Sequence, residues 1–176
     1  AFFFYSMGVQ TVMLVAIDFG IKELKLENTQ LIITAVIIQV VAIGGAIGMS
    51  RLSALFGNIK VLSLTVSLWI GVCIAGYFMQ TEVHFYIIAS LVGLVMGGIQ
   101  SLSRSTYSKL MPETKDTASF FSFYDVTEKI AAVVGIFSFG LITELTGSQR
   151  SSTLVLAVFF VIGLCILIFS AALTYV

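Results

Sequence analysis

Six long apolar stretches divide this chain, and they limit what it can fold into more than any other feature. A transmembrane helix needs about 20 mostly apolar residues. By that rule the sequence predicts spans over residues 1–21, 29–49, 61–79, 85–110, 117–145 and 152–176. We therefore expect an all-α membrane protein with six transmembrane helices, embedded in a lipid bilayer.

The amino-acid composition supports a membrane protein and excludes several other classes. Hydrophobic residues make up 59% of the chain and charged residues 10%, whereas soluble domains hold about 45–50% and about 25%. The net charge of zero gives no reason to expect nucleic acid as a partner. With one histidine and no hydrolase or phosphate-binding motif, we expect neither an enzyme nor a cofactor or metal site. The apolar start at Ala1, without Met, predicts a fragment of a longer protein.

The basic residues between the spans predict that both termini are cytoplasmic. In that orientation five Lys and Arg residues lie in the inner connections and three in the outer ones, as the positive-inside rule favours. The inner residues are Arg51, Lys60, Arg104, Lys109 and Lys115, and the outer residues are Lys22, Lys25 and Arg150.

Small residues recur at helical spacing in three spans. Gly44 and Gly48 form one GxxxG pair and Gly93 and Gly97 form another, while the Gly71–Ala75 spacing is a weaker version. Such pairs let helix backbones approach closely in lipid, so we expect them at helix contacts. The adjacent glycines at 97 and 98 would also permit the fourth span to bend.

Three charged residues lie inside the fifth span, where charge is expensive. Asp125, Glu128 and Lys129 fall within five residues, and each costs at least about 2.5–3.5 kcal/mol at the bilayer centre. The cluster indicates a polar pathway, and hence transport. Asp125 and Lys129 are four residues apart, so we expect an ion pair within the helix. Glu128 would then lack a helical partner and is our candidate proton site. The alternative is that the three residues only lock helices together.

Other polar residues extend the candidate pathway to neighbouring spans. Arg104 is either an anchor at the cytoplasmic interface or a gate that pairs with an acid on another helix. Gln100, Gln10 and Gln39 either contact a solute or hold helices together by hydrogen bonds. Tyr124 precedes the charged cluster and is a further candidate contact.

Three stretches carry a family resemblance. They are Tyr5–Thr11, Gly97–Ser105 followed by Met111-Pro112, and Phe120–Asp125 followed by Glu128-Lys129. With six spans, the chain resembles the carboxy-terminal half of a bacterial major facilitator superfamily transporter from the vacuole-effluxer-like branch. It departs from that branch at Met7, where relatives commonly carry an acid, and at Ser122, where they carry glycine. The loop at 51–60 keeps Gly57 and Lys60 of the superfamily motif but has no Asp.

The resemblance implies a fold and a mechanism. The six helices would form two inverted three-helix repeats, and an amino-terminal six-helix half would complete the transporter. A small polar solute, with amino acids as one option, would cross the bacterial inner membrane by alternating access, with proton coupling left open. Gln10, Gln100 and Tyr124 would contact the solute, while Asp125 and Lys129 would set the field at Glu128.

Two other functions stay open from the sequence. A six-span protein that dimerises into a pore would need no second half. A membrane scaffold or receptor would bury and pair its charges at 125, 128 and 129, with no cavity beside them. An isolated half would leave its pathway face uncovered, so we also expect it to form a homodimer.

Overall fold

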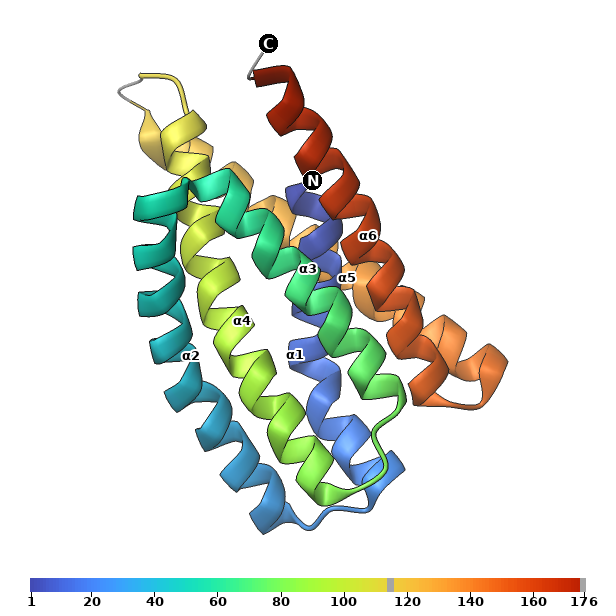
Figure 1. The fold of residues 1–176 in the computed structure, drawn as a ribbon. Helices are drawn as coiled ribbons and strands as arrows, with labels where there is room; N and C mark the ends of the chain where they lie inside the picture. Colours follow the sequence, from blue (N-terminus) through green and yellow to red (C-terminus); the bar gives the residue numbers. More distant parts are fainter. Residues whose placement is uncertain (114–115, 175–176) are drawn as a thin grey trace.

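The computed structural model describes residues 1–113 and 116–174, and this part of the chain forms six helices (Figure 1). They are α1 Phe2–Leu24, α2 Asn28–Phe56, α3 Asn58–Tyr77, α4 Glu82–Leu110, α5 Thr117–Thr146 and α6 Gln149–Thr174. All six are long and apolar enough to cross a membrane. The expected all-helical, six-span fold is confirmed. Lys115 and the last two residues of the sixth predicted span lie outside the described residues.

Local signals in the sequence place the helix ends. Glu27 and Gln30 form a reciprocal capping box at the start of α2, and Thr81 accepts a hydrogen bond from the backbone N–H of His84 at the start of α4. Gly57 ends α2 with φ 89°, and Gly147 ends α5 with φ 69°. Glycine adopts positive φ without the steric cost that a Cβ brings, so these two positions set the turns.

The helices pack in three pairs that repeat with internal symmetry. α2 lies along α4, α1 lies along α5, and α3 lies along α6. Exchanging α1, α2 and α3 with α4, α5 and α6 converts the first pair into the second and preserves the third. Successive helices run in opposite directions, and both ends of the described chain lie toward the same end of the bundle (Figure 1). This is the packing pattern expected of two inverted three-helix repeats.

Aromatic packing fixes the pair formed by α3 and α6. The rings of Trp69 and Phe160 are both fully buried and stack with their centroids 5.3 Å apart. Val66 and Leu156, each at most 1% exposed, belong to the same core. Offset or stacked aromatic pairs add about 0.5–1.5 kcal/mol beyond their buried area. Aromatic and aliphatic side chains therefore hold these two helices together.

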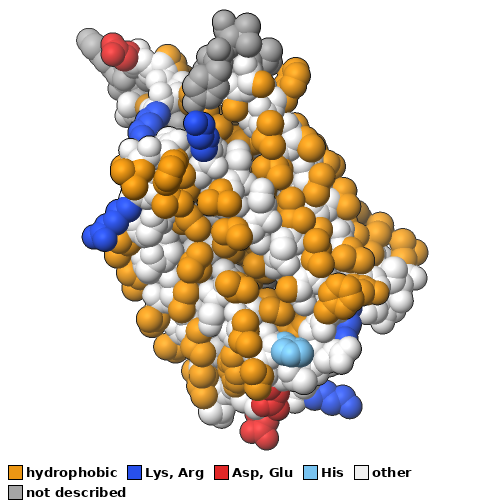
Figure 2. All heavy atoms as spheres, in the orientation of Figure 1, with side chains coloured by type: hydrophobic (Ala, Val, Ile, Leu, Met, Phe, Trp, Pro, Cys, Tyr) orange, Lys and Arg blue, Asp and Glu red, His pale blue; other side chains and the backbone are white. Residues whose placement is uncertain are grey.

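Apolar side chains also cover the outside of the bundle. Figure 2 shows hydrophobic side chains across the middle of one face, with charged side chains toward its two ends. Leu55, Phe137 and Leu145 are among the large apolar residues that are at least 70% exposed. Soluble monomers rarely expose such large apolar patches, whereas a lipid bilayer covers them. The structure thus supports an integral membrane protein.

The glycine predictions are partly confirmed and partly wrong. A Cβ on Gly93 or Gly97 of α4 would overlap a backbone carbonyl oxygen of α2, so this GxxxG pair is a helix contact. The contact from α2 comes from Gly45, which faces the backbone of Leu94. Gly44 and Gly48 have no atom within 4 Å of their Cβ positions, and the same holds for Gly71. The rotation of α2 about its axis, which spacing alone does not fix, turns Gly45 toward α4.

Candidate functional site

Polar side chains from three helices meet about two turns inside the end of the bundle that holds the N-terminus. We call this the three-helix polar cluster. Its members come from the first half of α1, the last third of α4 and the first half of α5: Tyr5, Gln10, Ser103, Arg104, Tyr124, Asp125 and Glu128.

Glu128 of α5 is bonded to α1. The Nε2 of Gln10 donates a hydrogen bond of 2.5 Å to Oε1 of Glu128, and both side chains are half-buried. Hydrogen bonds to a carboxylate are roughly twice as strong as those between neutral groups. Since the carboxylate and the amide come from different helices, the charge state of Glu128 affects how firmly α1 and α5 are joined.

Asp125 is paired with α4, which corrects the expected ion pair within α5. The Nη2 of Arg104 lies 3.4 Å from Oδ1 of Asp125. Lys129 is exposed and makes no ion pair among the described residues. The prediction was wrong because it considered one helix alone, whereas packing brings the Arg104 guanidinium from α4 to this carboxylate. The Arg104 and Asp125 side chains are 60% and 55% exposed, so the pair contributes little to folding stability.

Tyr124 is the aromatic centre of the cluster. Its side chain is buried, the ring of Phe2 stacks on it at 4.2 Å, and the ring of Tyr107 lies 5.1 Å away. The Arg104 guanidinium carbon lies 5.6 Å from the centre of the Tyr124 ring, within the range of a cation–π interaction. Nearby, the hydroxyls of Tyr5 and Ser103 share a buried hydrogen bond of 2.8 Å. Aromatic packing therefore holds the polar groups in place.

A small hollow lies beside Glu128. Its volume is about 10 Å³, close to the smallest space that holds one water molecule. Among its lining residues are Gln10, Gln100, Ser103, Tyr124 and Glu128.

Some of the predicted site residues lie in or beside the three-helix polar cluster, and others lie outside it. The cluster brings together Gln10, Arg104, Tyr124, Asp125 and Glu128 (positions on α1, α4 and α5), and Gln100 adjoins it in the hollow. Lys129 is exposed and makes no ion pair among the described residues, and Gln39 is exposed on α2 outside the cluster.

Sequence reasoning missed Ser103 and Phe2 as members of the site. Ser103 lies three residues after Gln100, so helical spacing offered a signal for it. Phe2 gave no such signal, because an aromatic residue in an apolar run looks like ordinary packing.

A second polar network joins α1 to α6 at the opposite end. Asp18 pairs with Lys22 at 2.9 Å and accepts a hydrogen bond of 2.6 Å from Gln149. Glu23 lies 3.2 Å from Nε of Arg150. Three of these five residues come from the last two turns of α1, so the network fixes that end of the helix against the start of α6.

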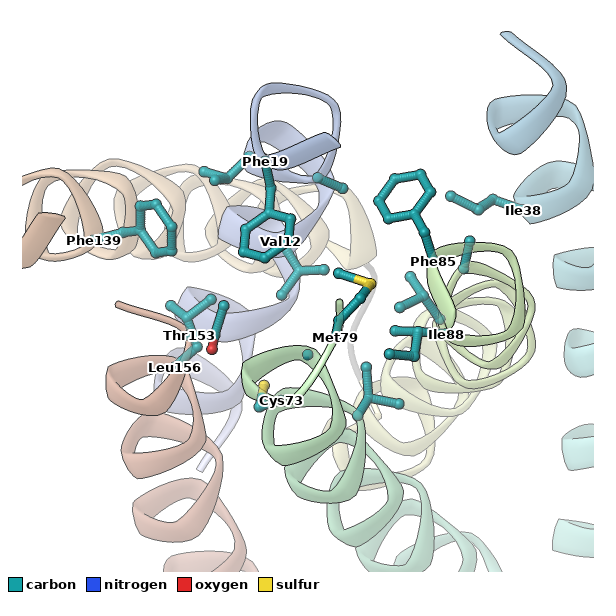
Figure 3. A pocket seen from close by; sticks show the side chains of 16 residues that line it. Val12, Phe19, Ile38, Cys73, Met79, Phe85, Ile88, Phe139, Thr153 and Leu156 are labelled. Atoms are coloured by element: carbon teal, nitrogen blue, oxygen red, sulfur yellow. The ribbon is translucent and has the colours of Figure 1, made fainter. Parts of the chain in front are cut away.

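A cavity of about 90 Å³ lies deeper in the bundle, but its lining is apolar (Figure 3). Val12, Met79 and Ile88 approach one another across it, and Thr153 supplies one of its few polar atoms. None of the predicted pathway residues lines it. A polar solute would lose its hydration there without replacement hydrogen bonds, so this cavity is not a candidate site for such a solute.

No group of three or more His, Cys, Asp or Glu side chains in the described part of the chain is placed to hold a metal ion. The three-helix polar cluster has carboxylates, amides and a guanidinium on separate helices, which suits reversible charge pairing.

Comparison with known proteins identifies relatives along nearly the whole chain. Residues 1–172 match the family model described as vacuole effluxer Atg22 like. An uncharacterized MFS-type transporter, YxiO of Bacillus subtilis (strain 168), is 35% identical over 169 residues. That match covers 96% of this chain and 39% of the relative. No solved structure gives a significant match.

Fungal proteins also match. Autophagy-related protein 22 of Yarrowia lipolytica is 30% identical over 178 residues, which cover 94% of this chain and 30% of the relative. Autophagy-related protein 22 of Kluyveromyces lactis is 30% identical over 173 residues, which cover 92% of this chain and 35% of the relative. The chain thus spans 30–39% of the length of these relatives. Because the family model covers almost every residue, the chain belongs to the vacuole effluxer Atg22-like family.

Proposed function

We propose that this chain forms the carboxy-terminal half of a secondary transporter that moves a small polar solute by alternating access. The names of the family and of its relatives point to a transporter rather than an enzyme. An amino-terminal six-helix half of the same protein would cover the exposed side of the three-helix polar cluster. The transporter would lie in the bacterial inner membrane with both termini of this half in the cytoplasm.

The observation that carries the proposal is the pair of polar links that α5 makes to different helices. Glu128 is bonded to Gln10 of α1, and Asp125 is paired with Arg104 of α4. Both links join α5 to the first helix of an inverted repeat, α1 or α4, so a movement of either helix against α5 would break and remake one of them.

Glu128 is the proton carrier in this mechanism. Protonation removes the charge that strengthens its hydrogen bond with Gln10, so α1 is released from α5. The solute binds to the Gln10 amide, the Gln100 amide and the Tyr124 hydroxyl, and its polar groups replace the broken bond. Arg104 and Asp125 remain as the second link and keep α4 aligned with α5. Lys129 contributes positive charge near the cluster and lowers the cost of the Glu128 carboxylate.

The charges of the three-helix polar cluster suit an amino acid as the transported solute. The cluster carries one guanidinium and two carboxylates, which complement the carboxylate and ammonium of a zwitterion. The competing scaffold function requires charges that are buried and paired. Asp125 and Lys129 are exposed, which favours transport over a scaffold.

Reconstitution of the full-length protein in liposomes tests the proposal. A pH gradient is imposed, amino acids and dipeptides are added, and solute-dependent proton movement is followed with a pH-sensitive dye. We expect Glu128→Gln to abolish coupled proton movement, a loss of at least tenfold, because an amide does not carry the proton. Solute binding, measured by thermal shift, should persist in this variant.

Glu144→Gln is the matched control, because Glu144 is an exposed glutamate on the same helix, 16 positions along and outside the cluster. It should transport as the wild type does. Unchanged coupling in Glu128→Gln would remove Glu128 from the mechanism. No solute-dependent signal from the wild type with any solute would contradict transport of this class.

A further inference from the structure

A basic hollow lies where the end of α2, the start of α3 and the end of α4 meet. Its volume is about 310 Å³, which corresponds to roughly ten water molecules at about 30 Å³ each. The lining residues are Ser53, Ala54, Gly57, Asn58, Ile59, Lys60, Thr106, Lys109 and Leu110. Figure 2 shows Lys and Arg side chains gathered toward the same end of the bundle. None of these residues belongs to the three-helix polar cluster.

No acid lines the hollow, and the acids at this end of the bundle, Glu113 and Asp116, lie in the connection after α4. The sequence has no Asp or Glu between Glu27 and Glu82, so α2 and α3 carry none. Glu82, the acid of α4, lies at the other end of that helix. Within the described ranges, no carboxylate pairs with Lys60 or Lys109. Among the described residues, the two ammonium groups therefore make no ion pair.

Hydrogen-bond donors and apolar groups share the lining. Nζ of Lys109 donates to Oδ1 of Asn58 at 2.8 Å, which holds this ammonium at the rim. Asn58 also donates to Oγ of Ser105 at 2.9 Å. The adjoining start of α3 has Gly57 as its cap and no side-chain cap bond, so its first backbone N–H groups add positive potential. Leu110 is 69% exposed beside these polar groups.

We propose that this hollow binds the phosphate head group of an anionic phospholipid. Two lysines that make no ion pair among the described residues and the uncapped N–H groups of α3 suit a phosphodiester, which carries negative charge and accepts several hydrogen bonds. Basic pockets between transmembrane helices at the cytoplasmic surface bind anionic head groups. The exposed apolar residues at the rim would contact the acyl chains, which a free phosphate lacks. The proposal does not depend on the transported solute or on Glu128.

Native mass spectrometry of the full-length protein tests the site. Phosphatidylglycerol and phosphatidylcholine are titrated separately, and glycerol phosphate is titrated as the soluble anion. We expect phosphatidylglycerol to bind more tightly than either of the others. Lys60→Gln should weaken phosphatidylglycerol binding about fivefold, because one lysine near an anionic surface contributes about 1 kcal/mol. Lys109→Gln should have a similar effect.

Arg51→Gln is the control, because Arg51 lies at the same end, is exposed and does not line the hollow. Its affinity for phosphatidylglycerol should match that of the wild type. Equal losses in Arg51→Gln and Lys60→Gln would indicate diffuse surface charge and overturn the proposal. Equal affinities for the two lipids would also overturn it, and glycerol phosphate binding as tightly as phosphatidylglycerol would assign the hollow to a soluble anion instead.

Discussion

Arg104 and Arg150 each pair with a carboxylate on another helix, but their surroundings differ. In the Arg104–Asp125 pair the side chains are 60% and 55% exposed, whereas in the Arg150–Glu23 pair they are 28% and 22% exposed. Exposed ion pairs typically contribute about 0–1 kcal/mol. A partly buried carboxylate that loses its partner costs more, because it is left less solvated. The same residue type therefore has different effects at the two ends of the bundle.

The two substitutions Arg104→Gln and Arg150→Gln should separate stability from transport. We expect Arg104→Gln to lower the free energy of unfolding by less than about 1 kcal/mol. Arg150→Gln should lower it by about 1–3 kcal/mol, because Glu23 loses a charge-assisted bond in a half-buried site. Thermal unfolding of the purified protein in detergent measures both. Transport should show the reverse order, with the larger loss in Arg104→Gln.

A charge exchange checks that the Arg104–Asp125 pair, and not either residue alone, matters for transport. The double variant Arg104→Asp/Asp125→Arg should recover part of the transport lost in Arg104→Asp. If the double variant is no better than the single one, the pair has no role as a unit.

At the scale of the element, close backbone contact at three glycines joins α2 and α4, beside the Met49 side chain of α2 that packs on Gly98. Gly93 and Gly97 face backbone atoms of α2, and Gly45 faces backbone atoms of α4. No side chain stands between the helices at these points, so each backbone fits directly against the other. The contact tolerates no added methyl group without a shift of one whole helix.

Gly44 and Gly45 offer a test in adjacent residues. Gly45→Ala should destabilise the protein by about 1–3 kcal/mol, because its Cβ would overlap the carbonyl of Leu94. Gly44→Ala meets no atom within 4 Å and should be neutral or stabilising by up to about 1 kcal/mol, as alanine favours helix. Thermal unfolding of the two variants under identical conditions measures the difference in stability between them. Similar effects from both would contradict the packing of α2 on α4.

At the scale of the whole molecule, the basic residues at the two ends of the bundle predict how it is oriented in the membrane. The described chain begins and ends at one end of the bundle, which also carries Arg51, Lys60, Arg104 and Lys109, four basic residues. The opposite end carries Lys22, Lys25 and Arg150. The excess of basic residues at the first end predicts that it faces the cytoplasm.

Single-cysteine labelling checks this orientation. In a background without Cys73 and Cys165, Glu113→Cys marks the connection between α4 and α5, and Gln80→Cys marks the one between α3 and α4. Both positions are exposed. A membrane-impermeant thiol reagent applied to intact cells should label Gln80→Cys and should label Glu113→Cys only after the cells are opened. The opposite pattern would invert the proposed topology.

The sequence alone determined the class of protein and the identity of the charged residues at its site. Bilayer thickness fixes the length of an apolar span, so six spans were readable without a structure. Caps such as Thr81 and positive-φ glycines such as Gly57 are local signals at helix ends, whereas the apolar pattern alone ended the second span at residue 49 and α2 continues to Phe56. The cost of charge in lipid singled out Asp125 and Glu128.

Only the tertiary structure decided which of these residues meet. Asp125 pairs with Arg104 and not with Lys129, and Gly45, not Gly44, faces α4. Both outcomes depend on the rotation of one helix against another, which is set by many small packing contacts spread along the interface. Periodicity places a residue on a face of its own helix, but it carries no information about which neighbouring helix that face will contact.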